Sequence, residues 1–148
     1  MNSPHRRQFL GRSLGVAQVA VASVLLPGAA RAFAPATSAD ARRLSFNHLH
    51  TRERTALVYA VGSDFLPPAL THLNHFLRDH YTGEVGQMDP ELYNVLHRVR
   101  RELGTDLPFH VISGYRSPAT NETLRTTRGG GVARRSLHMD GKAIDVRL

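Results

Sequence analysis

The most informative stretch of this sequence is its last thirteen residues, SLHMDGKAIDVRL (Ser136–Leu148). They place His138 and Asp145 seven positions apart, with Gly141 between them. Imidazole nitrogen and carboxylate oxygen are both ordinary zinc ligands, and a catalytic zinc usually takes three protein ligands. A glycine gives the backbone the freedom for a sharp turn that would bring the two side chains together. The spacing therefore indicates half of a metal site and leaves a third ligand to be found.

The first 32 residues have the pattern of a targeting segment. Arg6-Arg7-Gln8-Phe9-Leu10 is a twin-arginine pattern, an apolar run covers residues 14–26, and Ala30-Arg31-Ala32 has the form of a cleavage site. The run is shorter than the roughly 20 apolar residues that cross a bilayer, so we expect no stable membrane insertion. The pattern predicts a twin-arginine signal peptide, use of the twin-arginine export machinery and a periplasmic location. The alternative is an amphipathic surface helix.

The net charge of the chain is smaller when this segment is left out. It holds four of the nineteen basic residues and no acid, so the net charge falls from +7 to +3 over the remaining 116 residues. No basic stripe interleaved with aromatic residues appears, and we therefore expect no nucleic-acid partner. A mildly basic exported protein suits an anionic wall polymer. The chain has no cysteine, so a metal would have to be held by His, Asp or Glu.

The rest of the chain alternates strand and helix patterns. Residues 33–42 form a spacer rich in Ala, Pro, Thr and Ser, and a domain is expected over residues 43–148. Strand patterns cover residues 44–50, 56–61, 109–113 and 143–148, and helix patterns follow Pro67-Pro68, Asp89-Pro90 and Ser117-Pro118. This order predicts an α+β fold, with helices packed on a small antiparallel sheet.

Two helical stripes are expected to form much of the core, and two polar residues are expected to cap helices. Asp89 and Ser117 precede prolines at helix starts, which is typical of N-caps. The first stripe comprises Leu70, Leu73, Phe76 and Leu77, and the second comprises Leu92, Val95, Leu96, Val99 and Leu103.

The terminal segment also resembles a known signature. Ser136, His138, Gly141, Ala143 and Asp145 match S-x-H-x-x-G-x-A-x-D of a zinc peptidase clan that includes bacterial D-Ala-D-Ala peptidases, lysostaphin and the hedgehog amino-terminal domain. Within that clan the chain resembles the YcbK-like murein endopeptidase K family. The resemblance runs from about residue 44 to residue 148, through the segments NHLHT, LNHFLRDHYTGEV, MDPELYNVLH and ISGYRSPATNETLR.

The resemblance implies a role for each matching residue. His138 and Asp145 match two zinc ligands, so Zn²⁺ is the implied cofactor. Arg116 matches an arginine that binds substrate and stabilises the oxyanion, which makes it the catalytic residue expected here. Its guanidinium is a permanent, fork-shaped cation suited to that task. Ser136 would help to bind substrate. The alternatives are a turn arginine paired with Glu122 or solvent, and a serine that merely caps a loop.

The implied activity is that of a zinc metallopeptidase that hydrolyses peptide cross-links or stem peptides of peptidoglycan during cell-wall remodelling. In that family the third ligand histidine and the catalytic base lie beyond the first motif, so here they are expected beyond Leu148. The implied fold is a LAS-type zinc peptidase fold that lacks its last strands. The alternative reading is an inactive truncated fragment or a non-catalytic wall-binding remnant. The remaining histidines, including His48, His50 and His80, are expected to be ordinary hydrogen-bonded residues rather than ligands.

Overall fold

The computed structural model describes residues 40–127 and 131–148. The expected signal peptide and most of the expected spacer lie outside these residues. The first strand begins at Ala41, two residues before the expected domain boundary. No helix in the described part of the chain is long and apolar enough to cross a membrane.

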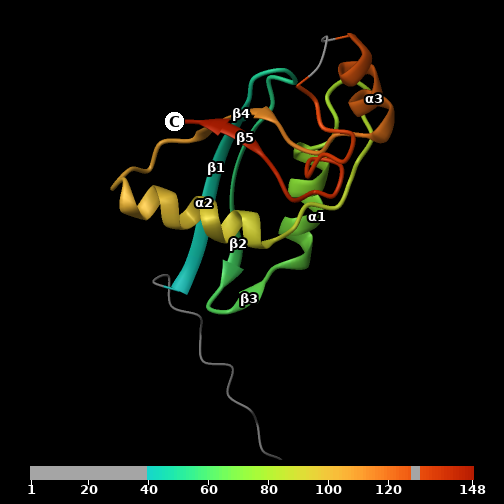
Figure 1. Ribbon diagram of the computed structural model, residues 1–148. Coiled ribbons are helices and arrows are strands. Elements are labelled where there is room, and N and C mark those ends of the chain that lie inside the picture. Colours follow the sequence, from blue (N-terminus) through green and yellow to red (C-terminus); the bar gives the residue numbers. More distant parts are fainter. Residues whose placement is uncertain (1–39, 128–130) are drawn as a thin grey trace, which may run out of the picture. The chain divides into compact units, whose positions relative to one another are not determined.

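A five-stranded sheet forms the centre of the domain, with the order β3-β2-β1-β4-β5 (Figure 1). The strands are β1 (Ala41–His48), β2 (Arg54–Val61), β3 (Asp64–Phe65), β4 (Phe109–Ser113) and β5 (Asp145–Arg147). The α+β class is confirmed. The sheet is mixed rather than wholly antiparallel, because β1 and β4 run parallel. The long connection through two helices makes that pairing possible, since parallel neighbours need a crossover.

Strand β5 lies at the edge of the sheet and pairs only with β4 among the described strands. Val146 is paired with Val111, and both Ile144 and Val146 pack against the core. The strand expected over residues 143–148 is thus present but covers only Asp145–Arg147, and Leu148 is 44% exposed. The outer edge of β5 is left without a strand neighbour in the part of the chain that the structure describes.

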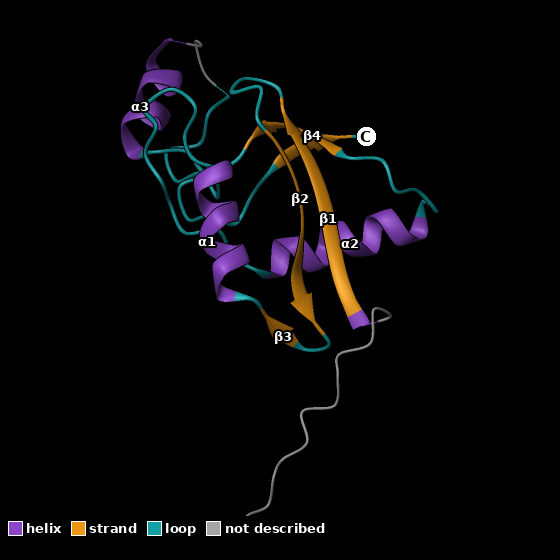
Figure 2. Ribbon diagram, turned by 180° about the vertical axis from the view of Figure 1, so that it is seen from behind, coloured by secondary structure: helices purple, strands orange, loops and turns teal. Residues whose placement is uncertain are grey.

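The three helices are α1 (Pro67–Phe76), α2 (Glu91–Glu102) and α3 (Pro118–Thr127). Helix α2 crosses the sheet in front of β1 and β2 in Figure 1 and behind them in Figure 2. Asp89 caps the first turn of α2 as expected, since its Oδ1 accepts a hydrogen bond from the Glu91 N–H at 3.0 Å. Ser117 likewise caps α3 through the Thr120 N–H at 3.2 Å.

The core contains the whole first stripe and only part of the second. Leu73, Phe76 and Leu77 are buried, and Leu70 packs against them. On α2, however, Val95 and Leu103 are 48% and 62% exposed, so their expected burial is wrong. The helix instead turns Tyr93 and Arg100 inwards.

Arg100 can be buried because it is fully engaged in polar contacts. Its guanidinium donates to Asp106 Oδ1 at 2.7 Å and to the Arg43 carbonyl at 3.3 Å. A buried cation needs such partners. The spacing of apolar residues alone does not predict a buried arginine such as Arg100.

Candidate metal and substrate site

A tight turn carries the terminal motif. The Met139 N–H donates to the Ser136 carbonyl at 2.9 Å, and the Lys142 N–H donates to the Leu137 carbonyl at 2.8 Å. Gly141 is buried in this turn at φ +67°, a conformation that costs little only for glycine. The turn brings His138 back towards the start of β5, as the sequence led us to expect.

His138 and Asp145 are brought together. His138 Nε2 lies 3.4 Å from Asp145 Oδ2, and their side chains are 12% and 53% exposed. His138 Nδ1 lies 2.8 Å from the Gly114 carbonyl, to which it can only donate. Nδ1 therefore carries a proton, and Nε2 is the ring nitrogen that faces the Asp145 carboxylate. A carbonyl that fixes the tautomer in this way is typical of metal-ligating histidines.

These two donors fit a zinc ion as part of a ligand set. The described residues contain no group of three or more His, Cys, Asp or Glu side chains arranged to hold a metal ion. His48, His50 and His80 do cluster, but His50 and His80 stack with ring centroids 4.0 Å apart and planes 8° apart. Nitrogen lone pairs lie in the ring plane, so stacked rings cannot both aim at one ion.

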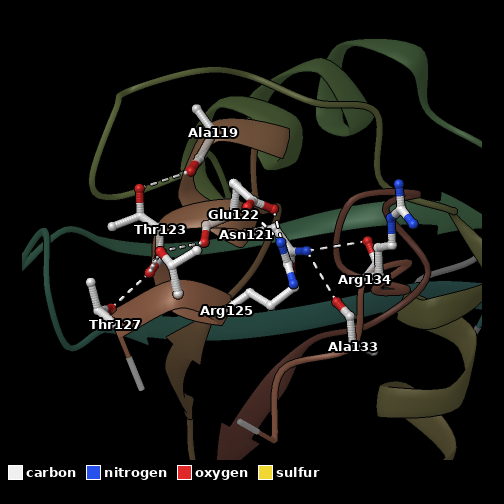
Figure 3. Close-up of polar contacts among 9 residues, drawn as sticks. Ala119, Asn121, Glu122, Thr123, Arg125, Thr127, Ala133 and Arg134 are labelled. Atoms are coloured by element: carbon white, nitrogen blue, oxygen red, sulfur yellow. Dashed lines mark hydrogen bonds and ion pairs between the residues drawn. The ribbon is translucent and has the colours of Figure 1, made fainter. Parts of the chain in front are cut away.

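Arg116 lies directly beside this pair. Its backbone N–H donates to the His138 carbonyl at 3.2 Å, and its Nη1 reaches Asn121 Oδ1 at 3.4 Å. Glu122 pairs with Arg125 at 2.7 Å (Figure 3), and it forms no ion pair with Arg116 in the described part of the chain. An ion pair between Arg116 and Glu122 is thus excluded, and the Arg116 charge is not neutralised by that carboxylate.

Asn121 ties α3 to the loop that precedes the motif. Its Nδ2 donates to the carbonyls of Ala133 and Arg134 at 3.1 and 3.4 Å (Figure 3). Ser136 is less engaged: its Oγ accepts the His138 N–H at 3.4 Å. That contact is a weak loop cap, and substrate binding by Ser136 stays a prediction.

Asp79 is a positioning residue that the sequence analysis missed. It is 1% exposed and accepts hydrogen bonds from the N–H and Oγ of Ser117 and the N–H of Tyr81, at 2.7 to 2.9 Å. Burial alone would raise the pKa of Asp79, but these donors, with Thr120, lower it to about 2. The ionised carboxylate thus fastens the chain after α1 to the turn that carries Arg116.

A cavity of about 140 Å³ lies between these elements. Arg116, Asp145, His50 and His80 are among the residues that line it. Its other lining residues are Asp79, Tyr81, Ile112, Ser113, Tyr115, Thr120 and Leu124. The predicted catalytic arginine and one predicted ligand therefore share a cavity, whereas Ser136 and His138 are not among its lining residues.

His48 shapes the turn that presents His50. It is 2% exposed, and its Nδ1 accepts the N–H groups of His50 and Thr51 at 3.2 and 3.4 Å. Burial is the main cause that lowers its pKa to about 4, with the nearby His80 and His50 adding to it. His48 is therefore neutral at pH 7 and acts as a hydrogen-bond acceptor.

We expect acid to destabilise the domain through His48. The unfolded chain takes up this proton near pH 6.5 and the folded chain only near pH 4, so stability is full above pH 6.5 and falls as the pH drops towards 4. A shift of this size corresponds to about 3 kcal/mol. Urea unfolding at pH 7 and pH 4 should show the loss, and His48→Gln should lose about 3 kcal/mol less. Equal losses in both proteins would contradict this role.

Comparison with known proteins places the chain in a family. The family model described as peptidoglycan L,D-endopeptidase MepK matches residues 36–148. The chain belongs to this family. Peptidoglycan L,D-endopeptidase MepK of Escherichia coli K12 is 38% identical over 135 residues, which cover 91% of this chain and 72% of that protein. The probable MepK of Haemophilus influenzae is 33% identical over 136 residues, with the same two coverages.

As a MepK family member the chain is a peptidase, which confirms the resemblance seen in its terminal motif. No solved structure matches it significantly.

Proposed function

We propose that this chain is a zinc-dependent peptidoglycan L,D-endopeptidase whose centre is built on His138, Asp145 and Arg116. The observation that carries the proposal is the close approach of His138 Nε2 to Asp145 Oδ2, with His138 Nδ1 engaged by the Gly114 carbonyl. The two curated relatives are both named as L,D-endopeptidases, one of them as probable. We take the same bond class for this chain.

In this proposal, the zinc ion and the side chains of His138, Asp145 and Arg116 each have a separate role. When bound, zinc supplies a Lewis acid that polarises the scissile carbonyl and activates water. His138 and Asp145 would hold it. Arg116 would stabilise the negative charge that develops on the carbonyl oxygen, since its backbone N–H is bonded to the His138 carbonyl and its side chain lines the same cavity as Asp145. Among the described residues, no third His, Cys, Asp or Glu joins His138 and Asp145 in a group that could hold a metal ion.

Export to the periplasm by the twin-arginine machinery is part of the proposal. It rests on Arg6-Arg7 and the apolar run that follows, and on the cell-wall substrate named for the relatives. Cleavage after about Ala32 would leave the matched region intact, because the family match begins at residue 36.

The alternative function is non-catalytic wall binding. It is favoured by the same absence of a three-donor metal group from residues 40–127 and 131–148. Zinc titration separates the two. A catalytic centre is expected to take up about one equivalent of zinc, and His138→Ala should abolish that uptake. A folded protein that binds peptidoglycan but takes up no zinc would favour the alternative.

Replacement of Arg116 with lysine should weaken catalysis while leaving zinc binding intact. A lysine keeps the positive charge but loses the planar fork of donors. Loss of one oxyanion donor typically costs about 100 to 1000-fold in kcat, and we expect an effect at the lower end. Steady-state hydrolysis of a cross-linked muropeptide measures it, with Arg125→Lys as the control on α3. An unchanged kcat would remove Arg116 from the oxyanion role.

A further inference from the structure

A second cavity lies between the start of β1 and the end of α2. Its volume is about 340 Å³, and it shares no lining residue with the cavity beside Arg116. Its charged lining groups are three arginines against one carboxylate, so positive charge is in excess there. The lining residues are Ala41, Arg43, His97, Arg100, Arg101, Gly104, Thr105 and Asp106.

Arg100 gives this cavity a fixed wall. It is 7% exposed, and its guanidinium donates to Asp106 Oδ1 at 2.7 Å. It also donates to the carbonyls of Thr105 and Arg43, at 3.4 and 3.3 Å. These bonds tie the loop after α2 and strand β1 to the helix. Because Arg100 and Asp106 pair with each other, their charges cancel, and the excess charge belongs to the other two arginines.

Arg43 and Arg101 supply that excess. Both are exposed, and neither forms an ion pair within residues 40–127 and 131–148. Arg43 lies on β1 and Arg101 on α2, so the fold brings them to one cavity from distant parts of the sequence. A guanidinium presents a planar fork of N–H donors that matches the two oxygens of a carboxylate.

The pKa of His97, in the same cavity, reflects the positive surroundings. Burial is the main cause that lowers it, and the charges of Arg101, Arg42 and Arg100 lower it further. His97 is therefore mostly neutral at pH 7 and does not add to the charge. Beside the cavity, Glu102 is outnumbered by Arg98 and Arg101.

Helix stability does not account for this cluster. Basic residues in the last turn of a helix interact favourably with its carbonyl end, which explains a preference for arginine at positions 100 and 101. It does not explain Arg43, which belongs to a strand. The carbonyls of Arg100 and Arg101 are also already satisfied, since they accept the N–H groups of Thr105 and Gly104, each at 3.2 Å. The convergence of Arg43 and Arg101 is thus available for a ligand.

We propose that Arg43 and Arg101 form an anion-binding site that holds the protein on the cell wall through the carboxylates of peptidoglycan stem peptides. The site is separate from the cavity in which cleavage is proposed, so it would keep the enzyme on the polymer between cleavage events. The inference rests on the proposed function for the identity of the polymer. It goes beyond it by assigning wall binding to residues outside the signature motif.

Co-sedimentation of the zinc-free protein with sacculi tests the site without hydrolysis. Two kinds of sacculi are compared: untreated sacculi, and sacculi amidated with methylamine and a carbodiimide, which removes the carboxylate charges. We expect about 10-fold tighter binding to the untreated sacculi, because hydrogen bonds between charged groups are the stronger ones. The preference should shrink at high salt, since exposed charges are then screened.

The double variant Arg43→Gln/Arg101→Gln should lose most of this preference. Both positions are exposed, so the fold should survive, and urea unfolding checks that it does. The matched control is Arg125→Gln/Arg134→Gln, which removes the same charge from exposed positions on α3 and in the loop after it. The control should keep most of the preference.

Three outcomes would overturn the site. The first is equal binding to both kinds of sacculi. The second is an equal loss in the two double variants, because binding would then follow net charge alone. The third is tighter binding to phosphatidylglycerol vesicles than to untreated sacculi, which would assign the arginines to a lipid phosphate.

Cleavage of a soluble muropeptide with zinc present is a separate measurement. Arg43→Gln/Arg101→Gln should leave it within about twofold of the parent, since substitutions at exposed positions away from the reacting groups usually have small effects. A protein that cleaves muropeptides but shows no preference for carboxylates loses only this site. A protein that shows the preference without cleavage keeps the site and loses the proposed activity.

Discussion

Replacement of Asp145 with alanine should abolish hydrolysis of peptidoglycan peptides and weaken zinc binding by more than about 100-fold. Changes to residues that only support a ligand already cost about 10 to 100-fold in metal affinity, and Asp145 is expected to be a ligand itself. Its side chain is half exposed at the start of an edge strand. The fold should therefore survive the substitution, and the loss should appear in zinc calorimetry and in the hydrolysis assay together.

The matched control for this change is Asp140→Ala. Asp140 lies five positions away in the same motif, is exposed, and takes no part in the pair formed with His138. It should leave zinc affinity and hydrolysis within about twofold of the parent, as substitutions at exposed sites usually do. If both variants lost activity equally, the effect would belong to the loop and not to a metal ligand.

Replacement of Gly141 with alanine should destabilise the domain by roughly 4 kcal/mol. An added Cβ would lie 1.8 Å from the Gln87 carbonyl oxygen, and the φ of +67° is strained for alanine. The Gly141 carbonyl also accepts the Asp89 N–H at 2.9 Å, a bond that the necessary shift would break. Strain, overpacking and a lost hydrogen bond each contribute about 1 to 2 kcal/mol. Urea unfolding measures the sum.

Gly62→Ala separates conformational strain from steric clash. Gly62 has a similar φ of +57°, but an added Cβ there would meet nothing within 4 Å. It should cost only about 1 kcal/mol, the strain alone. Similar costs at both positions would show that the close approach of the terminal motif to Gln87 is unimportant.

Much of the site could be predicted because its chemistry is local in sequence. His138, Gly141 and Asp145 lie within one turn and one strand, so spacing and glycine freedom sufficed to bring the two side chains together. The caps at Asp89 and Ser117 are equally local. The α+β class followed from the order of strand and helix patterns.

What could not be predicted depends on contacts between distant segments. Asp79 follows an apolar stripe, and nothing in its neighbourhood indicates that Ser117, 38 positions away, will satisfy its carboxylate. The stack of His50 on His80 has the same origin. The parallel pairing of β1 with β4 is also a tertiary feature, since it depends on how the intervening helices cross the sheet. Val95 was misjudged because α2 buries Arg100 through partners elsewhere in the chain.

The most direct test of the account is mass spectrometry of the products released from purified peptidoglycan. The protein is first stripped of metal and incubated with sacculi that contain L,D cross-links. The incubation is then repeated with zinc restored to the protein. We expect cross-linked dimers to be converted to monomers only with zinc, and not by the Asp145→Ala variant. Cross-links that stay intact in the presence of zinc, with a folded protein bound to the wall, would contradict the catalytic account and leave the binding function in its place.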